Sequence, residues 1–273
     1  MDNILYVVGT PIGNLSDMSP RAIDTLENVD FIAAEDTRVT LKLLNHFNIK
    51  KPMVSYYEHN KRERGEIICN RILAGESCAI VTDAGMPCIS DPGEDLIKLC
   101  EEKGIKTVVV PGPSAVISAL AVSGLETGRF CFEGFLSVNK KSRKTHLESL
   151  LNETRTMIFY EAPHKLPATL KDLYSAFGDR KLTIVREITK IHEETIRTTT
   201  KYAAEVLAES NIKGEIVLVL EGAKEVQEES YTLEQAVELA RQLIEKGTKS
   251  SEAAKQAATM TGFKKNEIYK ELI

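Results

Sequence analysis

The sequence has few of the features that mark membrane, exported or disulfide-bonded proteins. Its apolar runs, of which 216–220 is among the longest, are far shorter than the roughly 18 residues that a membrane-spanning helix needs. The first nine residues lack a basic segment followed by an apolar one, so we expect no export signal. The five cysteines are odd in number and form no Cys-x-x-Cys pair, which is typical of reduced thiols. These absences predict a soluble cytoplasmic protein.

Several catalytic and binding motifs are also missing. The glycine-bearing loop 9–14 is not followed by the Gly-Lys-Ser/Thr of a Walker loop. No Gly-x-Gly-x-x-Gly fingerprint is present, which counts against a Rossmann dehydrogenase. The Gly-x-Ser-x-Gly nucleophile elbow is absent too. The five histidines are scattered, without His-Glu-x-x-His or Cys/His spacing, so we expect no metal site.

What the sequence does have is the composition of a globular protein. It contains 273 residues, of which 42% are hydrophobic and 27% charged. At about 150 residues per domain, this length favours two domains that each bury a core. The patterning predicts an α/β domain over 1–118, a second α/β domain over 119–225 and a helical appendage over 226–273.

The first of these segments alternates short apolar runs with amphipathic stretches, the βαβ pattern of a parallel or mixed sheet covered by helices. The expected strands are 4–8, 30–34, 52–57, 77–82 and 106–110. The expected helices are 20–27, 39–47, 64–73, 92–102 and 114–123. Ser19-Pro20 and Asp91-Pro92 each place an N-cap residue before a proline, with Glu94 as a capping-box acid.

After a glycine-containing junction at 125–129, the alternation resumes in a different form. The expected strands are 130–133, 156–160, 182–186, 195–199 and 215–220, and the expected helices are 143–151, 165–177 and 202–210. Strand alternation in 195–199 beside 182–186 predicts an antiparallel pair. The C-terminal pattern is purely helical, over 232–246, 249–258 and 264–272, with breaks at Gly247 and Gly262.

Four loops follow strands of the first domain: 9–14, 34–38, 82–93 and 111–115. Because parallel strands end at the same sheet edge, these loops predict a binding crevice there. Local alternatives exist for two of them. The first loop is also consistent with a tight turn, and in the second Asp36 or Thr37 could cap the next helix while Arg38 pairs locally.

In the second domain, the segments 159–165 and 186–194 are strand ends dense in ionisable groups, and either could face a cleft between the domains. Solvation of a charged surface is the simpler explanation of such runs. The compact basic cluster at 139–144 is either a mobile solvated loop or a phosphate contact.

Taken together, the loops resemble the tetrapyrrole methylase superfamily of S-adenosylmethionine-dependent methyltransferases. The motifs that carry the resemblance are Gly9-Thr10-Pro11-Ile12-Gly13-Asn14-Leu15, Ala34-Glu35-Asp36-Thr37-Arg38, Thr82-Asp83-Ala84-Gly85-Met86-Pro87, Ile89-Ser90-Asp91-Pro92-Gly93, Pro111-Gly112-Pro113-Ser114-Ala115, Phe159-Tyr160-Glu161-Ala162-Pro163-His164, Arg186-Glu187 and Thr189-Lys190. The resemblance implies two α/β domains with the cofactor in the cleft between them, and a homodimer. The residues that it implies for the cofactor are Ile12, Gly85, Met86, Ile89, Ser114, Ala115 and Ala162.

The resemblance is closest to a branch that acts on RNA. Gly85-Met86-Pro87 replaces the superfamily's Gly-Asp-Pro, which lowers the case for a tetrapyrrole substrate. That branch methylates the ribose 2′-hydroxyl of a cytidine (cytidine-1402) in the decoding region of 16S ribosomal RNA, so the implied partner is 16S RNA or the 30S subunit. A small substrate such as a tetrapyrrole and a non-catalytic ribosome-binding module remain alternatives.

Methyl transfer to a hydroxyl requires a group that takes up the proton. The candidates by residue type and loop position are Glu35, Asp36, Asp83, Glu161, Glu187 and Lys190. The candidates for holding RNA are Arg38, Lys140, Lys141, Arg143, Lys144 and Arg186. The C-terminal lysines, Lys249, Lys255, Lys264 and Lys265, are either a second RNA contact or part of a packing or dimer appendage.

The formal net charge of −5 is an average over segments of opposite sign. Residues 1–136 carry −6 and residues 202–245 carry −7, whereas 137–201 carry +5 and 246–273 carry +3. The acidic total therefore does not exclude a nucleic-acid partner. The two basic segments are where we expect phosphates to bind.

Overall fold

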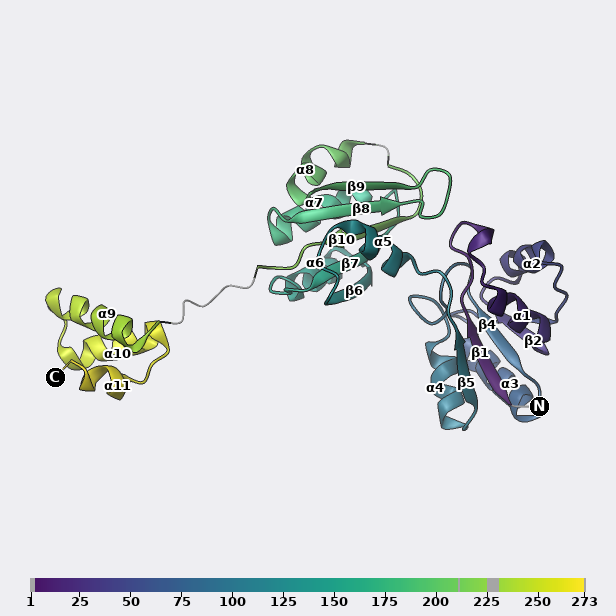
Figure 1. The fold of residues 1–273 in the computed structure, drawn as a ribbon, viewed down its shortest axis with the longest axis horizontal. Coiled ribbons are helices and arrows are strands. Elements are labelled where there is room, and N and C mark those ends of the chain that lie inside the picture. Colours follow the sequence, from purple (N-terminus) through teal and green to yellow (C-terminus); the bar gives the residue numbers. More distant parts are fainter. Residues whose placement is uncertain (1–2, 211, 225–230, 273) are drawn as a thin grey trace. The chain divides into compact units, whose positions relative to one another are not determined.

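The computed structural model describes residues 3–210, 212–224 and 231–272. The chain divides into two compact units, residues 1–223 and residues 224–273. The first unit holds both sheets, and the second holds three helices (Figure 1). This α/β architecture with a helical C-terminal unit is the predicted fold class.

The first sheet is parallel throughout, with strand order β3-β2-β4-β1-β5. Its strands are β1 (Ile4–Val8), β2 (Phe31–Ala34), β3 (Met53–Ser55), β4 (Cys78–Val81) and β5 (Lys106–Val110). The helices between them are α1 (Pro20–Asn28), α2 (Thr37–His46), α3 (Lys61–Leu73) and α4 (Glu94–Glu102), and a short 3-10 turn covers Leu15–Asp17. All five predicted strands of this sheet are present.

The central strands of this sheet are covered on both faces, which is why they are apolar throughout. Leu5 and Ile80 belong to a buried cluster with α3 and α4. Val8 and Val81 belong to a second cluster with α1 and α2. The loops at the carboxyl ends of the strands are thereby anchored to a sheet with a core on each side.

The second sheet is mixed, with order β6-β7-β10-β8-β9. Its strands are β6 (Phe130–Phe135), β7 (Thr156–Glu161), β8 (Lys181–Arg186), β9 (Glu194–Thr199) and β10 (Ile216–Leu220). β6 runs parallel to β7, and the remaining neighbours are antiparallel. The predicted antiparallel pairing of 182–186 with 195–199 is confirmed as β8–β9.

One face of the second sheet packs on α6 (Lys140–Ser149), α7 (Leu166–Phe177) and α8 (Thr200–Glu205), followed by a 3-10 turn over Leu207–Glu209. The other face packs on α5 (Ala115–Ser123), through Val116 and Leu120. Because α5 follows β5 of the first sheet, it joins the two sheets. The predicted domain boundary at 118–119 falls inside this helix, and that division of the chain stays a prediction.

The second unit consists of α9 (Leu233–Glu245), α10 (Ser250–Thr261) and α11 (Lys265–Lys270). Thr232 and Gln235 form a capping box at the start of α9. Gly262 takes a left-handed conformation after α10, as the predicted break requires. Ala236, Ala257 and Ile268 contribute to its own small core. None of the helices in the described residues is long and apolar enough to cross a membrane.

Two local predictions were wrong. α4 begins at Glu94 with Gly93 as its N-cap, and not at Pro92 after Asp91. Ser90 and Gly93 have φ values of 64° and 142°, so the chain is still turning where the Asp-Pro pair suggested a helix start. The segment 139–144 is not a loop: the side chain of Asn139 accepts hydrogen bonds from the backbone N–H groups of Lys141 and Ser142 and starts α6.

We expect Leu218→Ala to lower the free energy of unfolding by about 2–5 kcal/mol, because Leu218 lies in the central strand β10 and its side chain is fully buried. Leu151→Ala is the matched control, since Leu151 is 40% exposed. Urea unfolding followed by far-ultraviolet circular dichroism measures both. Equal losses in the two variants would contradict the placement of the core.

Candidate active site

Three loops of the first sheet meet through their backbones. Gly9 follows β1 and Gly112 follows β5, and a Cβ added to either glycine would come within 2.7 Å of the other's Cα. Thr10 and Gly85 exchange two backbone hydrogen bonds of 2.9 and 3.1 Å, which ties the loop after β1 to the loop after β4. Glycine is required at positions 9 and 112 because any side chain would push these loops apart.

Two further contacts fix the same loops. The hydroxyl of Thr10 donates to the carbonyl of Thr82 over 3.1 Å. The backbone N–H of Gly112 lies 3.3 Å from the sulfur of Met86. Gly85 has a φ of +87°, a conformation that side-chain-bearing residues rarely adopt. The crevice that the sequence predicts at this sheet edge is therefore a rigid structure in the first unit.

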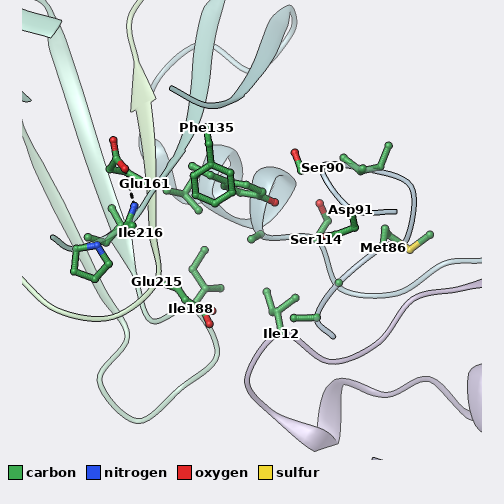
Figure 2. A pocket seen from close by; sticks show the side chains of 18 residues that line it. Ile12, Met86, Ser90, Asp91, Ser114, Phe135, Glu161, Ile188, Glu215 and Ile216 are labelled. Carbon is green, nitrogen blue, oxygen red and sulfur yellow. Dashed lines mark hydrogen bonds between the residues drawn. The ribbon is translucent and has the colours of Figure 1, made fainter. Parts of the chain in front are cut away.

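A cavity of about 470 Å³ opens beside these loops, and both sheets line it (Figure 2). The first sheet contributes the loops after β1, β4 and β5. The second sheet contributes the ends of β6 and β7 and the start of β10. The seven residues that the sequence predicts for the cofactor all line this cavity: Ile12, Gly85, Met86, Ile89, Ser114, Ala115 and Ala162.

Glu161 holds the second-sheet side of this cavity in place. Its side chain is buried, and its two oxygens accept hydrogen bonds from the backbone N–H of Ala162 and from the hydroxyl of Thr169. A carboxylate that is satisfied in this way positions the loop at Ala162. Glu161 was one of the candidate proton acceptors, but both of its oxygens already accept hydrogen bonds from the protein.

A second cavity, of about 350 Å³, adjoins the first. Ile12, Ala84 and Glu215 line both. Two of the predicted catalytic residues, Asp83 and Lys190, line the second cavity. These two residues are about a hundred positions apart in the sequence, and the fold brings both to the second cavity.

Lys190 is held by two carboxylates. Its Nζ lies 3.0 Å from Glu187 and 3.2 Å from Glu215. Partial burial opposes its charge, but the hydrogen bonds to these carboxylates outweigh that effect and raise the pKa of Lys190 above its usual value. Glu187 also accepts the backbone N–H of Glu215, which together with Lys190 lowers its pKa. Lys190 is therefore an ammonium donor at neutral pH.

Acidic side chains gather beside both cavities. Glu35 accepts the hydroxyl of Thr82 at 2.5 Å and the backbone N–H of Asp83 at 3.4 Å. Partial burial and the charge of Glu35 raise the pKa of Asp83. In the first cavity, burial and the charges of Glu35 and Asp83 raise the pKa of Asp91 to about 6.

Asp36 and Arg38 adopt the local alternative, in which Asp36 caps the next helix and Arg38 pairs with a neighbour. Asp36 is the N-cap of α2, and its carboxylate accepts the backbone N–H of Arg38 at 2.8 Å. It also pairs with the guanidinium of Arg38 at 2.6 Å. These hydrogen bonds lower the pKa of Asp36 to about 2. The roles predicted for this pair in catalysis and RNA binding stay predictions.

None of the predicted RNA-binding residues lines either cavity, Arg38 included. Arg143 pairs with Asp172 at 2.7 Å and is largely buried, and Arg186 pairs with Glu194 at 2.6 Å. Lys140, Lys141 and Lys144 lie on the first turns of α6 and are exposed. Only Lys144 of these three makes an ion pair within the described residues, with Glu148 at 3.7 Å.

Sequence reasoning missed several lining residues. Asp91 was assigned to a helix cap, and Glu215 to the first position of a strand. Phe135 and Tyr160, whose ring centroids are 5.4 Å apart, add an aromatic wall. Tyr160 lies in the motif 159–164, but neither ring was predicted to line a site. The long 82–93 loop was the one signal that could have pointed to Asp91.

The model of the family described as Tetrapyrrole (Corrin/Porphyrin) Methylases matches residues 4–204. The chain belongs to the tetrapyrrole methylase family. Among solved structures of tetrapyrrole methylases, a cobalt precorrin-4 methyltransferase superposes with a TM-score of 0.59 at 18% identity, over 80% of this chain and 95% of that one. At this identity the likeness concerns the fold alone.

Curated relatives within the tetrapyrrole methylases are much more similar. A protein from Synechocystis named ribosomal RNA small subunit methyltransferase I is 47% identical over 97% of this chain and 96% of its own. The protein of the same name from Bacillus subtilis is 46% identical over 97% of this chain and 92% of its own. A third, from Thermotoga maritima, is 47% identical over 218 residues, which are 80% of this chain and 98% of its own.

We expect the carboxyl group of Asp91 to titrate near pH 6. Since ionisation is disfavoured in the folded chain, its contribution to stability is complete below the pKa of the unfolded chain and is lost as pH rises through about 6. Glu35→Gln removes a neighbouring charge and should lower this pKa. Other groups that couple to Asp91 are Asp83, Cys88 and Tyr160.

Carbon-13 NMR of the Asp91 carboxyl, in the wild type and in Glu35→Gln, measures both effects. Asp179→Asn is the control, because Asp179 is exposed and does not contribute to the pKa of Asp91. A pKa near the usual aspartate value in the wild type would contradict the burial of this carboxyl.

Proposed function

We propose that this protein is an S-adenosylmethionine-dependent methyltransferase that methylates the ribose 2′-hydroxyl of a cytidine, cytidine-1402 by family resemblance, in 16S ribosomal RNA. The observation that carries the proposal is the similarity of nearly the whole chain to relatives named ribosomal RNA small subunit methyltransferase I, at 40–47% identity. The motif Gly85-Met86-Pro87, which lacks an acidic residue, favours this substrate over a tetrapyrrole.

The first cavity suits this cofactor in size and chemistry. Its volume of about 470 Å³ falls in the range of sites for small ligands, roughly 300–1,000 Å³. Glycine at position 85 leaves the backbone open to a ligand. Ile12, Ile89 and Phe135 supply apolar and aromatic surface, and Asp91 supplies one carboxylate.

The residues that line the first cavity have different roles in the proposed reaction. When bound, S-adenosylmethionine supplies an activated methyl group on a positively charged sulfonium. With a pKa of about 6, Asp91 is mainly ionised above neutral pH and places a negative charge in the cavity that receives this cation. The backbone contact of Thr10 with Gly85 fixes the wall, so the chain supplies orientation without having to rearrange.

Several further features of the reaction belong to the same proposal. The protein acts as a homodimer on 16S RNA or the 30S subunit, and it uses no metal. Within the described residues, no cluster of His, Cys, Asp and Glu suited to a metal ion is found. The Thermotoga relative is matched over 98% of its length by 218 residues of this chain, so it is close in length to the first unit. We place the methyl-transfer site wholly in that first unit.

The decisive experiment is transfer of a labelled methyl group. We expect label from S-adenosylmethionine to enter the RNA of 30S subunits that lack the modification, at a ribose 2′-oxygen. Mass spectrometry of the nucleosides identifies 2′-O-methylcytidine. Naked 16S RNA and a porphyrinogen are tested in parallel. Label in the porphyrinogen alone would refute the RNA substrate, and no label in any acceptor would refute the activity.

We expect Ala162→Phe to weaken S-adenosylmethionine binding at least about tenfold, because the larger ring takes up volume in the first cavity. The backbone bond from Ala162 to Glu161 does not depend on the side chain and should persist. Titration calorimetry measures the dissociation constant. Ala168→Phe is the matched control, since Ala168 is exposed on α7. Unchanged affinity in Ala162→Phe would place the cofactor elsewhere.

A further inference from the structure

The second cavity carries chemistry that the cofactor does not need. It lies against Gly13 and α2 and reaches Lys190 on the turn before β9. We propose that this cavity is the subsite for the acceptor ribonucleotide, with its ribose toward Asp83 and its phosphate toward Lys190. This inference rests on the proposed function and names the part of the molecule that receives the substrate.

Adjacency to the first cavity is the first argument. The two cavities share Ile12, Ala84 and Glu215, so a ligand in one lies directly beside a ligand in the other. Group transfer needs the reacting atoms about 3–3.5 Å apart before the reaction. The second cavity is therefore next to the one assigned to the cofactor, which is where an acceptor for methyl transfer has to bind.

An unsatisfied hydroxyl is the second argument. Thr40 lines the second cavity, is only 3% exposed, and its Oγ1 meets no hydrogen-bond partner among the described residues. A buried hydroxyl without a partner costs roughly 1–3 kcal/mol. The oxygen has almost no accessible surface in this structure, so a ribose hydroxyl becomes its partner once the Thr40 side chain turns toward the cavity.

The charges in the wall suit a ribose phosphate. Four charged side chains line this cavity: the cations Lys42 and Lys190, and the carboxylates Asp83, whose pKa is raised, and Glu215, which pairs with Lys190. Ammonium groups bind phosphate oxygens, whereas a carboxylate accepts a hydrogen bond from a hydroxyl. A carboxylate with a raised pKa is also suited to take up the proton that leaves the 2′-hydroxyl.

Lys190 is placed by a tightly constrained turn. Glu187 and Thr189 have φ values of 53° and 67°, in the left-handed region that such residues seldom adopt. A Cβ on Gly13 would lie 2.6 Å from the Cγ of Lys190, so the loop after β1 packs on this side chain. The ammonium group is therefore oriented before substrate arrives, which reduces the entropy cost of binding.

Apolar side chains complete the wall. Leu15, Val39 and Leu43 line the same cavity, and Val39 is 38% exposed. A nucleobase that has left its stack needs an apolar surface of this kind. The volume of about 350 Å³ is enough for one small ligand and does not admit a folded RNA helix, so we infer that a single nucleotide enters.

Two variants test the subsite by different means. Val39→Trp fills the cavity from an exposed position on α2, and Lys190→Met removes the ammonium group while keeping the length of the side chain. For both we expect the KM for 30S subunits to rise at least about tenfold. Since neither residue lines the first cavity, the dissociation constant for S-adenosylmethionine should stay within about twofold of the wild type.

Each variant has a control in which the same substitution is made away from both cavities. Val206→Trp puts the same ring at a 47% exposed position away from both cavities, and Lys171→Met removes an exposed lysine on α7. Both controls should keep the wild-type KM and cofactor affinity. Thermal unfolding checks that each variant is folded, and if one does not fold the other still tests the subsite.

The outcomes separate this inference from the proposed function. If the wild type transfers no methyl group to RNA, the proposed function fails. If the wild type methylates RNA and both variants keep its KM, the function stands and the subsite is wrong. If the variants lose cofactor affinity as strongly as activity, the second cavity is not a separate acceptor site, which also overturns the inference.

Discussion

The backbone contact between Gly9 and Gly112 is the constraint on which the site depends. It brings the ends of β1 and β5 so close that no side chain fits between them. The Thr10–Gly85 hydrogen bonds then add the loop after β4. Both cavities use walls from this assembly, Ile12 and Ala84 in particular. A parallel sheet with a core on each face gives the assembly a rigid base, because its strand ends cannot shift independently.

Two adjoining cavities differ in the chemistry of their linings. The first is mostly apolar, with Asp91 as a partly buried carboxylate, and the second has Lys190 and Asp83 in its wall. Charges of opposite sign lie at the shared wall, where Glu215 faces both cavities and also pairs with Lys190. Acidic neighbours that raise one another's pKa are typical of functional sites, since a purely structural core would avoid them.

The sequence predicted the sheet strands and the clustering of loops because both depend on periodicity and on the geometry of parallel strands. It could not predict the start of α4. Asp91-Pro92 has the local signature of a helix start, but the loop continues to Gly93 because tertiary contacts decide its course. Asp83 and Lys190 were named as candidates, but the second cavity itself was not predicted, since it depends on the loop of Lys190 packing on Gly13 in the loop after β1. Pairings between distant residues leave no mark in local spacing, so Glu215 could not be assigned to Lys190 in advance, whereas Glu187 is only three positions away from it.

The basic segment 137–201 shows why a charge count needs the fold to interpret it. Its excess of +5 includes Arg143 and Arg186, which form close ion pairs with Asp172 and Glu194. Each of these arginines points its Nε at a neighbouring carboxylate, which offsets part of the positive charge of the segment. Lys140 and Lys141 remain exposed on α6, and among the described residues neither makes an ion pair. These two lysines are therefore the more accessible positive charges of the segment, although sequence alone gives all four residues the same weight.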